Sequence, residues 1–357
     1  MNTQVYMPIL VIKDGEVKAL REISVDEANK VVPLMQITRK YKTEQLPNGH
    51  RKQVPYSETE SLGKRLNQLG GLLRFEKLFV DSRPLMQSNT NETIQKIGNL
   101  SGGQLFKSCV VIPVLTIEDL KTQNYDSNSI TYFKEHGICL RIFKEDINDF
   151  WLTIDSLLNK VDLKRKDVDL VIDYKKSNQE EVKELIQQTN KIKEANGWRS
   201  IFFANGSFPT NLSEFTNIGK NTKSRSDWDS WLLVRKGINQ GLDIGYGDYA
   251  IRNPQYMEPA ENATPSRSFI YARENEWVVM KGQTDDRNGE KAKQYRALSQ
   301  ILIKGKLVNA KHSCPMEKHI TNLDKNKGAD LGGFTTWIKL GIGHHISLTL
   351  HQISNLN

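Results

Sequence analysis

The sequence predicts a (β/α)8 barrel of the TIM type, an α/β fold, with an α+β extension at its C-terminus. Eight short apolar runs recur before residue 250, and a polar stretch with helical spacing follows each of them. Continuous β-branched runs are typical of parallel strands buried on both faces, and parallel strands need helical crossovers. Repeated strand–helix units of this number indicate a closed barrel. The runs are residues 5–12, 31–38, 77–81, 109–116, 138–143, 168–173, 200–204 and 242–246.

Helices are predicted between these runs. Residues 13–23 read as a turn and a short helix, and Ser24 with Glu27 has the spacing of a capping box before another helical stretch. Residues 38–56 are polar, so we expect a loop on the C-terminal face of the barrel. The other predicted barrel helices are residues 57–70, 91–100, 144–160 and 177–195.

The pattern changes after Asp248, which places a domain boundary near residue 255. Residues 1–255 then form the barrel, and residues 256–357 form an extension packed on it. Before the boundary, the long connection 210–240 carries Trp228 and Trp231, whose spacing puts both on one helix face as packing residues. In the extension we expect a hairpin at 268–281, helices at 288–303 and 315–325, and an extended stretch at 306–313.

Composition is that of a globular protein. Of the 357 residues, 38% are hydrophobic and 26% are charged, and no apolar run reaches the length of about 20 residues that a membrane span needs. Three cysteines are too few for a disulfide framework, which indicates a reducing, cytoplasmic setting. The net charge of +8 permits an anionic partner, but most basic runs alternate with acids, which favours solvated helix faces.

Function in such barrels is found at the C-terminal ends of the strands, which selects Asp81, Arg141, Asp173 and Asp248. A charge within a strand is costly to bury unless it is paired. Three carboxylates with one guanidinium could hold a divalent metal, or could bind phosphate through Arg141. The structural alternatives are a buried ion-pair network and strand-end caps.

A second candidate is the loop that begins at Asn205 and contains Ser207. It follows the seventh predicted strand, and its backbone N–H groups could face an anion as in glycine-rich loops. The alternative is a tight turn that uses Gly206 and Pro209.

Cysteine and histidine residues near the C-terminus give two further candidates. His312, Cys314 and His319 could contribute to a metal site, with His344 or His345 as a further ligand, although their spacing is not that of a paired zinc motif. Adjacent histidines point to different sides of a regular element, so at most one of His344 and His345 faces a given site. One of the pair could act as a general acid or base, and the alternative is one packed and one exposed histidine.

Short motifs in order along the chain resemble those of the phage-type Beta protein family, which occurs in bacteriophages and bacterial genomes. The resemblance implies a barrel-type α/β fold and a setting in mobile elements, without a defined activity. It also raises Asp81, Asp248, Trp337, His344 and His345 above the other candidates. One departure is Ile270 before Tyr271, where the family pattern suggests arginine. The motifs are residues 6–10, 13–16, 19–20, 32–34, 80–81, 207–209, 227–228, 231, 247–249, 314, 337 and 343–346.

Three functional hypotheses follow from these residues. The first is a metal-dependent enzyme acting on a nucleotide or nucleic acid, in which Asp81, Asp173 and Asp248 hold Mg²⁺ or Mn²⁺, Arg141 binds phosphate and one histidine moves the proton. The second is a non-catalytic binding or scaffold protein with a protein or nucleic-acid partner in a phage or anti-phage defence system. The third is direct nucleic-acid binding through the basic surface. No P-loop, Rossmann, HExxH or GxSxG motif is present to favour another enzyme class.

Overall fold

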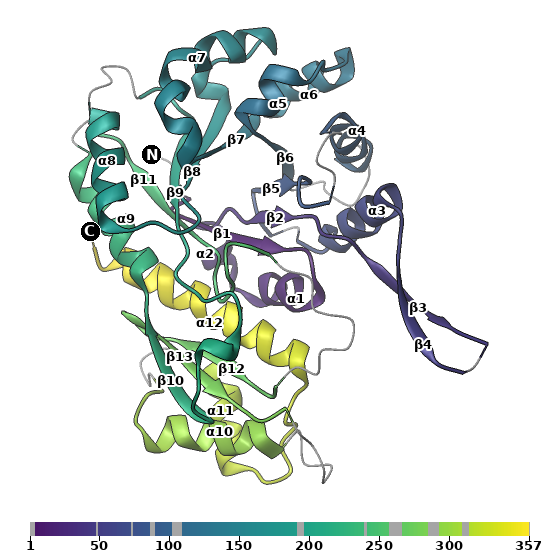
Figure 1. The fold of residues 1–357 in the computed structure, drawn as a ribbon, viewed down its shortest axis with the longest axis vertical. Coiled ribbons are helices and arrows are strands. Elements are labelled where there is room, and N and C mark those ends of the chain that lie inside the picture. Colours follow the sequence, from purple (N-terminus) through teal and green to yellow (C-terminus); the bar gives the residue numbers. More distant parts are fainter. Residues whose placement is uncertain are drawn as a thin grey trace.

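Eight parallel strands close into a barrel in the computed structural model, in the order β1-β11-β9-β8-β7-β6-β5-β2 (Figure 1). The TIM-type fold is therefore confirmed, and each predicted run contains one barrel strand, except that the last strand ends two residues later, at Asp248. The strands are β1 (Tyr6–Val11), β2 (Leu34–Gln36), β5 (Lys77–Asp81), β6 (Val110–Leu115), β7 (Ile138–Phe143), β8 (Val168–Asp173), β9 (Ser200–Ala204) and β11 (Ile244–Asp248). The structure describes residues 4–47, 49–72, 74–85, 90–101, 109–190, 196–238, 241–256, 266–284, 293–308 and 314–356.

Alternation of side chains along each strand determines which residues fill the barrel. Met7, Phe79, Cys139 and Val171 belong to one buried cluster, and they stand at alternate positions of their strands. Tyr6 and Tyr246 belong to the larger cluster, outside the barrel wall. The full interior cluster is Met7, Ile9, Val32, Leu34, Phe79, Ile112, Val114, Cys139, Val171, Phe202, Ala204 and Tyr249.

Helices cover the outside of the barrel as the periodicity predicts. Ser24 and Ser57 form capping boxes at the starts of α2 and α3, each satisfying backbone N–H groups of the first turn. The helices of the barrel are α1 (Asp14–Glu22), α2 (Val25–Ala28), α3 (Glu58–Leu69), α4 (Thr90–Ser101), α5 (Ile117–Thr122), α6 (Ser127–His136), α7 (Ile147–Lys160), α8 (Gln179–Asn190) and α9 (Ser226–Gly237).

The predicted loop at 38–56 is wrong: this segment forms an antiparallel hairpin of β3 (Tyr41–Gln45) and β4 (Arg51–Pro55). The hairpin leaves the C-terminal end of β2 and projects away from the barrel (Figure 1). Nearly all of its side chains are exposed on both faces. Its strands therefore lack the apolar alternation that identifies a half-buried hairpin in sequence.

The extension contains a three-stranded sheet in the order β10-β13-β12. The predicted hairpin is confirmed as β12 (Phe269–Ala272) and β13 (Glu276–Lys281). The third strand, β10 (Gly219–Ser224), comes from the long connection before residue 255 and pairs with β13 along its whole length. Sequence alternation did not reveal it, because its exposed positions are polar and it contains almost no apolar residue.

Three helices complete the extension: α10 (Lys293–Lys304), α11 (Pro315–Lys325) and α12 (Phe334–Ser354). The prediction of an extended stretch at 306–313 falls largely outside the described residues. Helix α12 runs between the barrel and the small sheet, where it packs against α1 and β1 on one side and against β12 and α11 on the other (Figure 1). Within the described residues, no helix is both long and apolar enough to cross a membrane.

Candidate functional site

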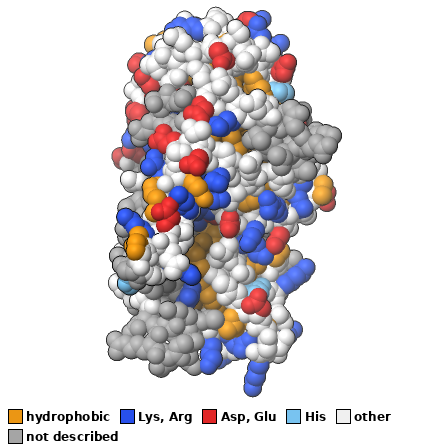
Figure 2. All heavy atoms as spheres, turned by 90° about the vertical axis from the view of Figure 1, so that its right-hand side faces the viewer, with side chains coloured by type: hydrophobic (Ala, Val, Ile, Leu, Met, Phe, Trp, Pro, Cys, Tyr) orange, Lys and Arg blue, Asp and Glu red, His pale blue; other side chains and the backbone are white. Residues whose placement is uncertain are grey.

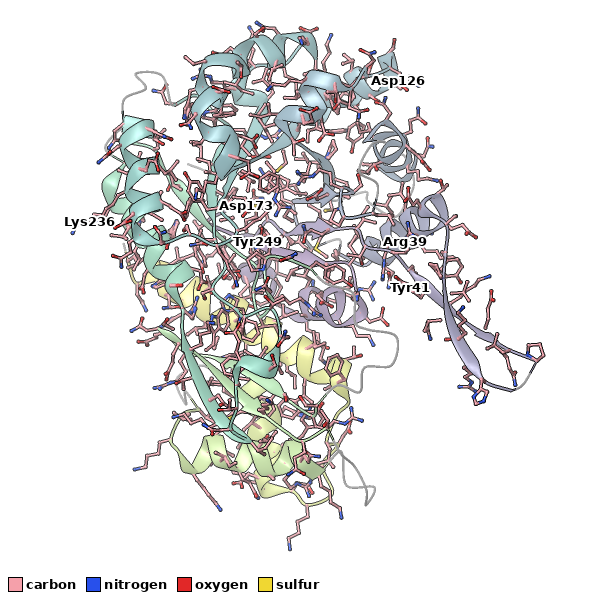
Figure 3. All side chains as sticks on the ribbon, in the orientation of Figure 1. Arg39, Tyr41, Asp126, Asp173, Lys236 and Tyr249 are labelled. Atoms are coloured by element: carbon pink, nitrogen blue, oxygen red, sulfur yellow. The ribbon has the colours of Figure 1, made fainter. Side chains whose placement is uncertain are left out.

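The barrel mouth brings together three of the predicted charged residues. Asp81, Arg141 and Asp173 end or lie within β5, β7 and β8 at inward-facing positions. Arg141 donates from Nη1 to Asp81 Oδ2 at 2.6 Å and from Nε to Asp173 Oδ2 at 2.9 Å. Tyr249, which follows β11, donates its hydroxyl to Asp173 Oδ2 at 2.6 Å and accepts from Arg141 at 2.8 Å. Asp173 and Tyr249 are labelled at the centre of Figure 3.

These charges are buried and neutralise one another. The exposed fractions of Asp81, Arg141 and Asp173 are 1%, 2% and 1%. Arg83 adds a second guanidinium, which donates to Asp81 through Nε at 2.8 Å and through Nη2 at 2.6 Å. Burial acts to raise the pKa of Asp81, but the guanidiniums of Arg83 and Arg141 outweigh it and hold that pKa below its usual range.

The predicted strand-end aspartates share a local geometry that the sequence did not reveal. In each case one carboxylate oxygen accepts the backbone N–H two residues later: Asp81 from Arg83 at 3.1 Å, Asp173 from Lys175 at 2.8 Å and Asp248 from Ala250 at 2.9 Å. Such Asx turns close the strand ends. Both structural alternatives, the ion-pair network and the strand-end cap, are thus present.

A similar ion cluster lies inside the opposite end of the barrel. Asp169 is fully buried and is bonded to Lys77 at 3.0 Å, to Arg199 Nη2 at 2.7 Å and to the Ser200 hydroxyl. Because the N-terminal face of such barrels contributes to stability rather than to catalysis, buried carboxylate–cation clusters in this chain do not by themselves indicate chemistry.

The mouth cluster consists of Asp81, Arg83, Arg141, Asp173 and Tyr249. Asp248 does not join it. It lies outside the barrel wall, where its Oδ1 accepts the Tyr6 hydroxyl at 2.7 Å and its Oδ2 contacts His345 Nε2 of α12 at 2.6 Å. Burial lowers the pKa of His345, so we treat the ring as neutral, with Nε2–H donating to the carboxylate. The expectation that the four charged residues converge at one mouth is therefore wrong for Asp248.

The cluster around Asp248, which we call the outer cluster, continues through side chains of α9, β11, β13 and the loop after β9. Asp227, at the start of α9, accepts hydrogen bonds from the Ser207 hydroxyl and, at 2.7 Å, from the Tyr246 hydroxyl. Trp277 of β13 donates its indole N–H to Ser207 at 2.9 Å. Ser207 thus contributes to the interior rather than to an open anion-binding loop, and Arg225 is buried beside the same cluster.

The side chain of Asn205 also makes hydrogen bonds within the protein. Its amide donates to the Ser177 hydroxyl at 2.8 Å, and its carbonyl oxygen accepts the Gly206 N–H at 2.9 Å. A Cβ on Gly206 would lie 2.4 Å from Pro254, so the loop needs glycine for close packing. These contacts match the tight-turn alternative for this loop.

The two adjacent histidines reach different surroundings, as their adjacency predicts, but both are buried, so the expectation of one exposed histidine is wrong. His344 donates its Nε2–H to Ala272 O, 2.8 Å away, and its Nδ1 lies 3.4 Å from Cys314 Sγ and 3.2 Å from Glu317 Oε1. His312 lies outside the described residues, and His319 packs against the Trp337 ring instead.

A family model described as "Beta protein" matches residues 6–351 of the chain. The chain belongs to the Beta protein family. The match spans the barrel and the extension, so it includes the mouth cluster, the outer cluster and the surroundings of His344. A search among curated proteins found no match.

Sequence reasoning missed Tyr249, Arg83 and Tyr6 as members of these clusters. Alternation of side chains along a strand could have identified Tyr249. Asp248 and its neighbour Tyr249 must point to opposite faces of the strand end. Gly245 and Gly247 confirm which face is inward: a Cβ on them would lie 2.5 Å from Phe202 and 2.9 Å from Ala204. Only Tyr249 of this strand end can therefore meet Arg141.

The depressed pKa of Asp81 predicts an acid-labile contribution to stability. The ion pairs favour the ionised carboxylate in the folded state, so this stability is fully present above the unfolded-state pKa of about 3.9 and is lost as the pH falls toward the lower folded-state pKa. We expect the stability difference between the wild-type protein and Asp81→Asn to shrink below about pH 4, by up to about 1.4 kcal/mol per pH unit. Urea unfolding at pH 6, 4 and 3 measures it, and a constant difference contradicts the assignment.

Proposed function

We propose that this member of the Beta protein family binds nucleic acid, with the β3–β4 hairpin and the cationic rim of the barrel mouth holding the phosphate backbone. The observation that carries the proposal is the charge of the hairpin. Residues 39–56, which comprise the hairpin and its flanking residues, contain five Lys or Arg and one Glu, so this segment has a net charge of +4 in a chain of net charge +8. Three of these cations, Lys42, Arg51 and Lys52, lie on the two strands.

The exposure of the hairpin supports this proposal. Both of its faces are exposed, including Tyr41 and Leu46, and it pairs with no other strand among the described residues. Isolated two-stranded hairpins are marginally stable in water, so a partner that covers this one would stabilise it. A two-stranded ribbon fits the major groove of duplex DNA, and Lys42, Arg51 and Lys52 on its strands would contact phosphates.

The rim of the mouth adds the exposed Lys175 and the partly exposed Arg83, whose guanidinium is paired with Asp81, beside the base of the hairpin. Gln36 at the end of β2 is in register with Asp81 at the end of β5, so the segment leading to the hairpin starts next to the strand end that Arg83 follows. Arg83 is partly exposed and Lys175 is exposed, and they approach the Phe143 ring at 5.3 and 4.3 Å. Figure 2, which faces the side from which the hairpin projects, shows many Lys and Arg side chains across the middle of this face.

The proposal does not include a metal-dependent step at the mouth. All four carboxylate oxygens of Asp81 and Asp173 accept hydrogen bonds from arginine, tyrosine or backbone groups. A bound Mg²⁺ or Mn²⁺ would have to displace these bonds, and this cofactor stays an untested prediction. We therefore favour a binding role in a phage or in defence against phages. The alternative is a protein partner, and the experiment below distinguishes it from nucleic acid. Trp228 and Trp231 offer such a partner no surface, because they are buried against each other.

Fluorescence anisotropy with a labelled DNA duplex of mixed sequence tests the proposal. We expect the affinity to fall steeply with salt, by a slope of about 0.9 for each phosphate contact. Replacing Lys42, Arg51 and Lys52 together by glutamine is expected to weaken binding at least about 10-fold at fixed salt and to reduce the slope by about 3. We expect the strands to stay paired in this variant, because the replaced side chains are exposed.

A matched control removes the same charge from the other end of the barrel. Lys160, Lys164 and Lys166 are exposed and precede β8, so they lie on the N-terminal side. Replacing them by glutamine is expected to leave affinity and salt slope nearly unchanged. If both triple variants weaken binding equally, the affinity depends on net charge alone and the hairpin is not the binding surface. If the wild-type protein does not bind DNA, the proposal is wrong and a protein partner is favoured.

A further inference from the structure

Three electron-pair donors converge in the extension, away from the barrel mouth and the hairpin. They are the Cys314 thiol immediately before α11, the Glu317 carboxylate in its first turn and the His344 ring of α12. All three side chains are buried, and one ligand atom from each lies within 4.8 Å of the others. Within the described part of the chain, no other group of three Cys, His, Asp or Glu residues meets this condition.

Two of the three separations, both from His344 Nδ1, fit the edges of a tetrahedron around zinc. Zinc binds sulfur at about 2.3 Å and nitrogen or oxygen at about 2.0–2.1 Å, which gives ligand separations of about 3.5 Å between S and N and about 3.3 Å between N and O. The structure has 3.4 Å from Cys314 Sγ to His344 Nδ1, and 3.2 Å from His344 Nδ1 to Glu317 Oε1.

Neighbouring groups hold the ligands in the orientation that a metal needs. Nε2 of His344 lies 2.8 Å from the Ala272 carbonyl, an acceptor, so Nε2 carries the proton. Tyr271 donates its hydroxyl to Glu317 Oε1 at 3.1 Å and stacks on the His344 ring, with 4.2 Å between centroids. The Cys314 N–H donates to Glu317 Oε2 at 2.9 Å. Metal-binding histidines and carboxylates commonly have such outer partners.

The contact between His344 and Glu317 needs a bridging ion, because Nε2 of His344 carries the ring proton and its Nδ1 faces a carboxylate oxygen. The Nδ1 lone pair of His344 and the Glu317 oxygen would repel each other at 3.2 Å unless a proton or a metal ion lay between them. These two alternatives differ in a measurable way.

We propose that Cys314, Glu317 and His344 bind a zinc ion, with a solvent molecule as fourth ligand. His344 and Tyr271 also line a cavity of about 840 Å³ between the small sheet and α12, which gives a route for that solvent. Three protein ligands with one open position are the pattern of zinc sites that bind or activate a small ligand. The ion would link α11 to α12 and so fix the extension to the helix that packs on the barrel. The site is independent of the proposed nucleic-acid surface.

Metal analysis of the purified full-length chain tests the proposal. We expect one zinc per chain after incubation with Zn²⁺ and gel filtration, and a thiolate-to-metal charge-transfer band when Co²⁺ replaces it. Cys314→Ser is expected to abolish the band and to weaken zinc binding by more than the about 10–100-fold that loss of an outer partner costs. Cys109→Ser is the matched control, because Cys109 is also a buried free cysteine but lies before β6 in the barrel.

A second variant keeps the test decisive if Cys314→Ser folds poorly. Tyr271→Phe removes only the hydroxyl on Glu317, and we expect zinc affinity to fall about 10-fold while the fold persists. Zinc should also raise the thermal midpoint of the wild-type protein, and a chelator should reverse this rise. Absence of stoichiometric zinc and of the cobalt band, or equal binding by Cys314→Ser, overturns the proposal and leaves a proton-bridged cluster.

Discussion

Replacing Arg141 by methionine is expected to destabilise the protein by about 3–5 kcal/mol, the usual cost of removing one partner from a buried ion pair. Arg141 is 2% exposed and is bonded to both Asp81 and Asp173. Its loss leaves Asp173 inside the barrel without a cation from the described residues in contact, since Arg83 reaches only Asp81. Urea unfolding at pH 7, followed by far-UV circular dichroism, measures the change.

Two further variants show whether charge or packing is responsible. Arg83→Met removes a partly exposed guanidinium from the same cluster, and we expect a cost of about 1 kcal/mol, because solvent screens this group. Adding Asp81→Asn and Asp173→Asn to Arg141→Met removes the uncompensated charges and should restore part of the lost stability. If the triple variant is less stable than Arg141→Met alone, the loss reflects packing and hydrogen bonding, and the charge argument is wrong.

The barrel was predictable because its signal is local. A strand buried on both faces must be apolar throughout, so runs such as residues 138–143 stand out from the polar helices that follow them. The same rule singled out Arg141, because a charge inside such a run needs a buried partner. The partners, Asp81 and Asp173, followed from the neighbourhood of strand ends in a barrel.

The remaining features depend on long-range packing or on the absence of burial. The β3–β4 hairpin buries neither face, and β10 is a mostly polar strand recruited across the chain by β13, so neither has an apolar pattern. Asp248 was wrongly predicted to face the barrel mouth, because the prediction used only its position at a strand end. Alternation along the strand places its side chain outside the barrel wall. Glu317 lies in a helix with no distinctive spacing, and only the packing of α11 against α12 brings it to His344.

The adjacent histidines of α12 connect this helix to two different parts of the molecule. His344 faces the extension, and His345 faces the barrel wall, where it meets Asp248 and packs 4.8 Å from the Trp277 ring. Residues next to each other on a helix are about 100° apart, so a single helix turn can serve both sides. The sequence predicted this divergence, while the burial of both rings follows from the position of α12 between barrel and sheet.

We therefore expect His345→Ala to cost about 3–5 kcal/mol, because it removes the ring that donates to a buried carboxylate and leaves a cavity beside Trp277. His351→Ala on the same helix is the control, since His351 is exposed and its loss should stay within about 0.5 kcal/mol. Urea unfolding of both variants at pH 7 gives the comparison.

A double-mutant cycle with Asp248→Asn then isolates the contact between the two residues. Because Asp248 and His345 touch, we expect a coupling energy of about 0.5–3 kcal/mol, with the double variant more stable than the sum of the single losses predicts. Asp248 also accepts from Tyr6 and Ala250, so part of its contribution persists without the histidine. Additive losses would mean that His345 stabilises the protein by filling space alone. In that case α12 would be held on the barrel by apolar packing, and the motif histidine would have no polar role there.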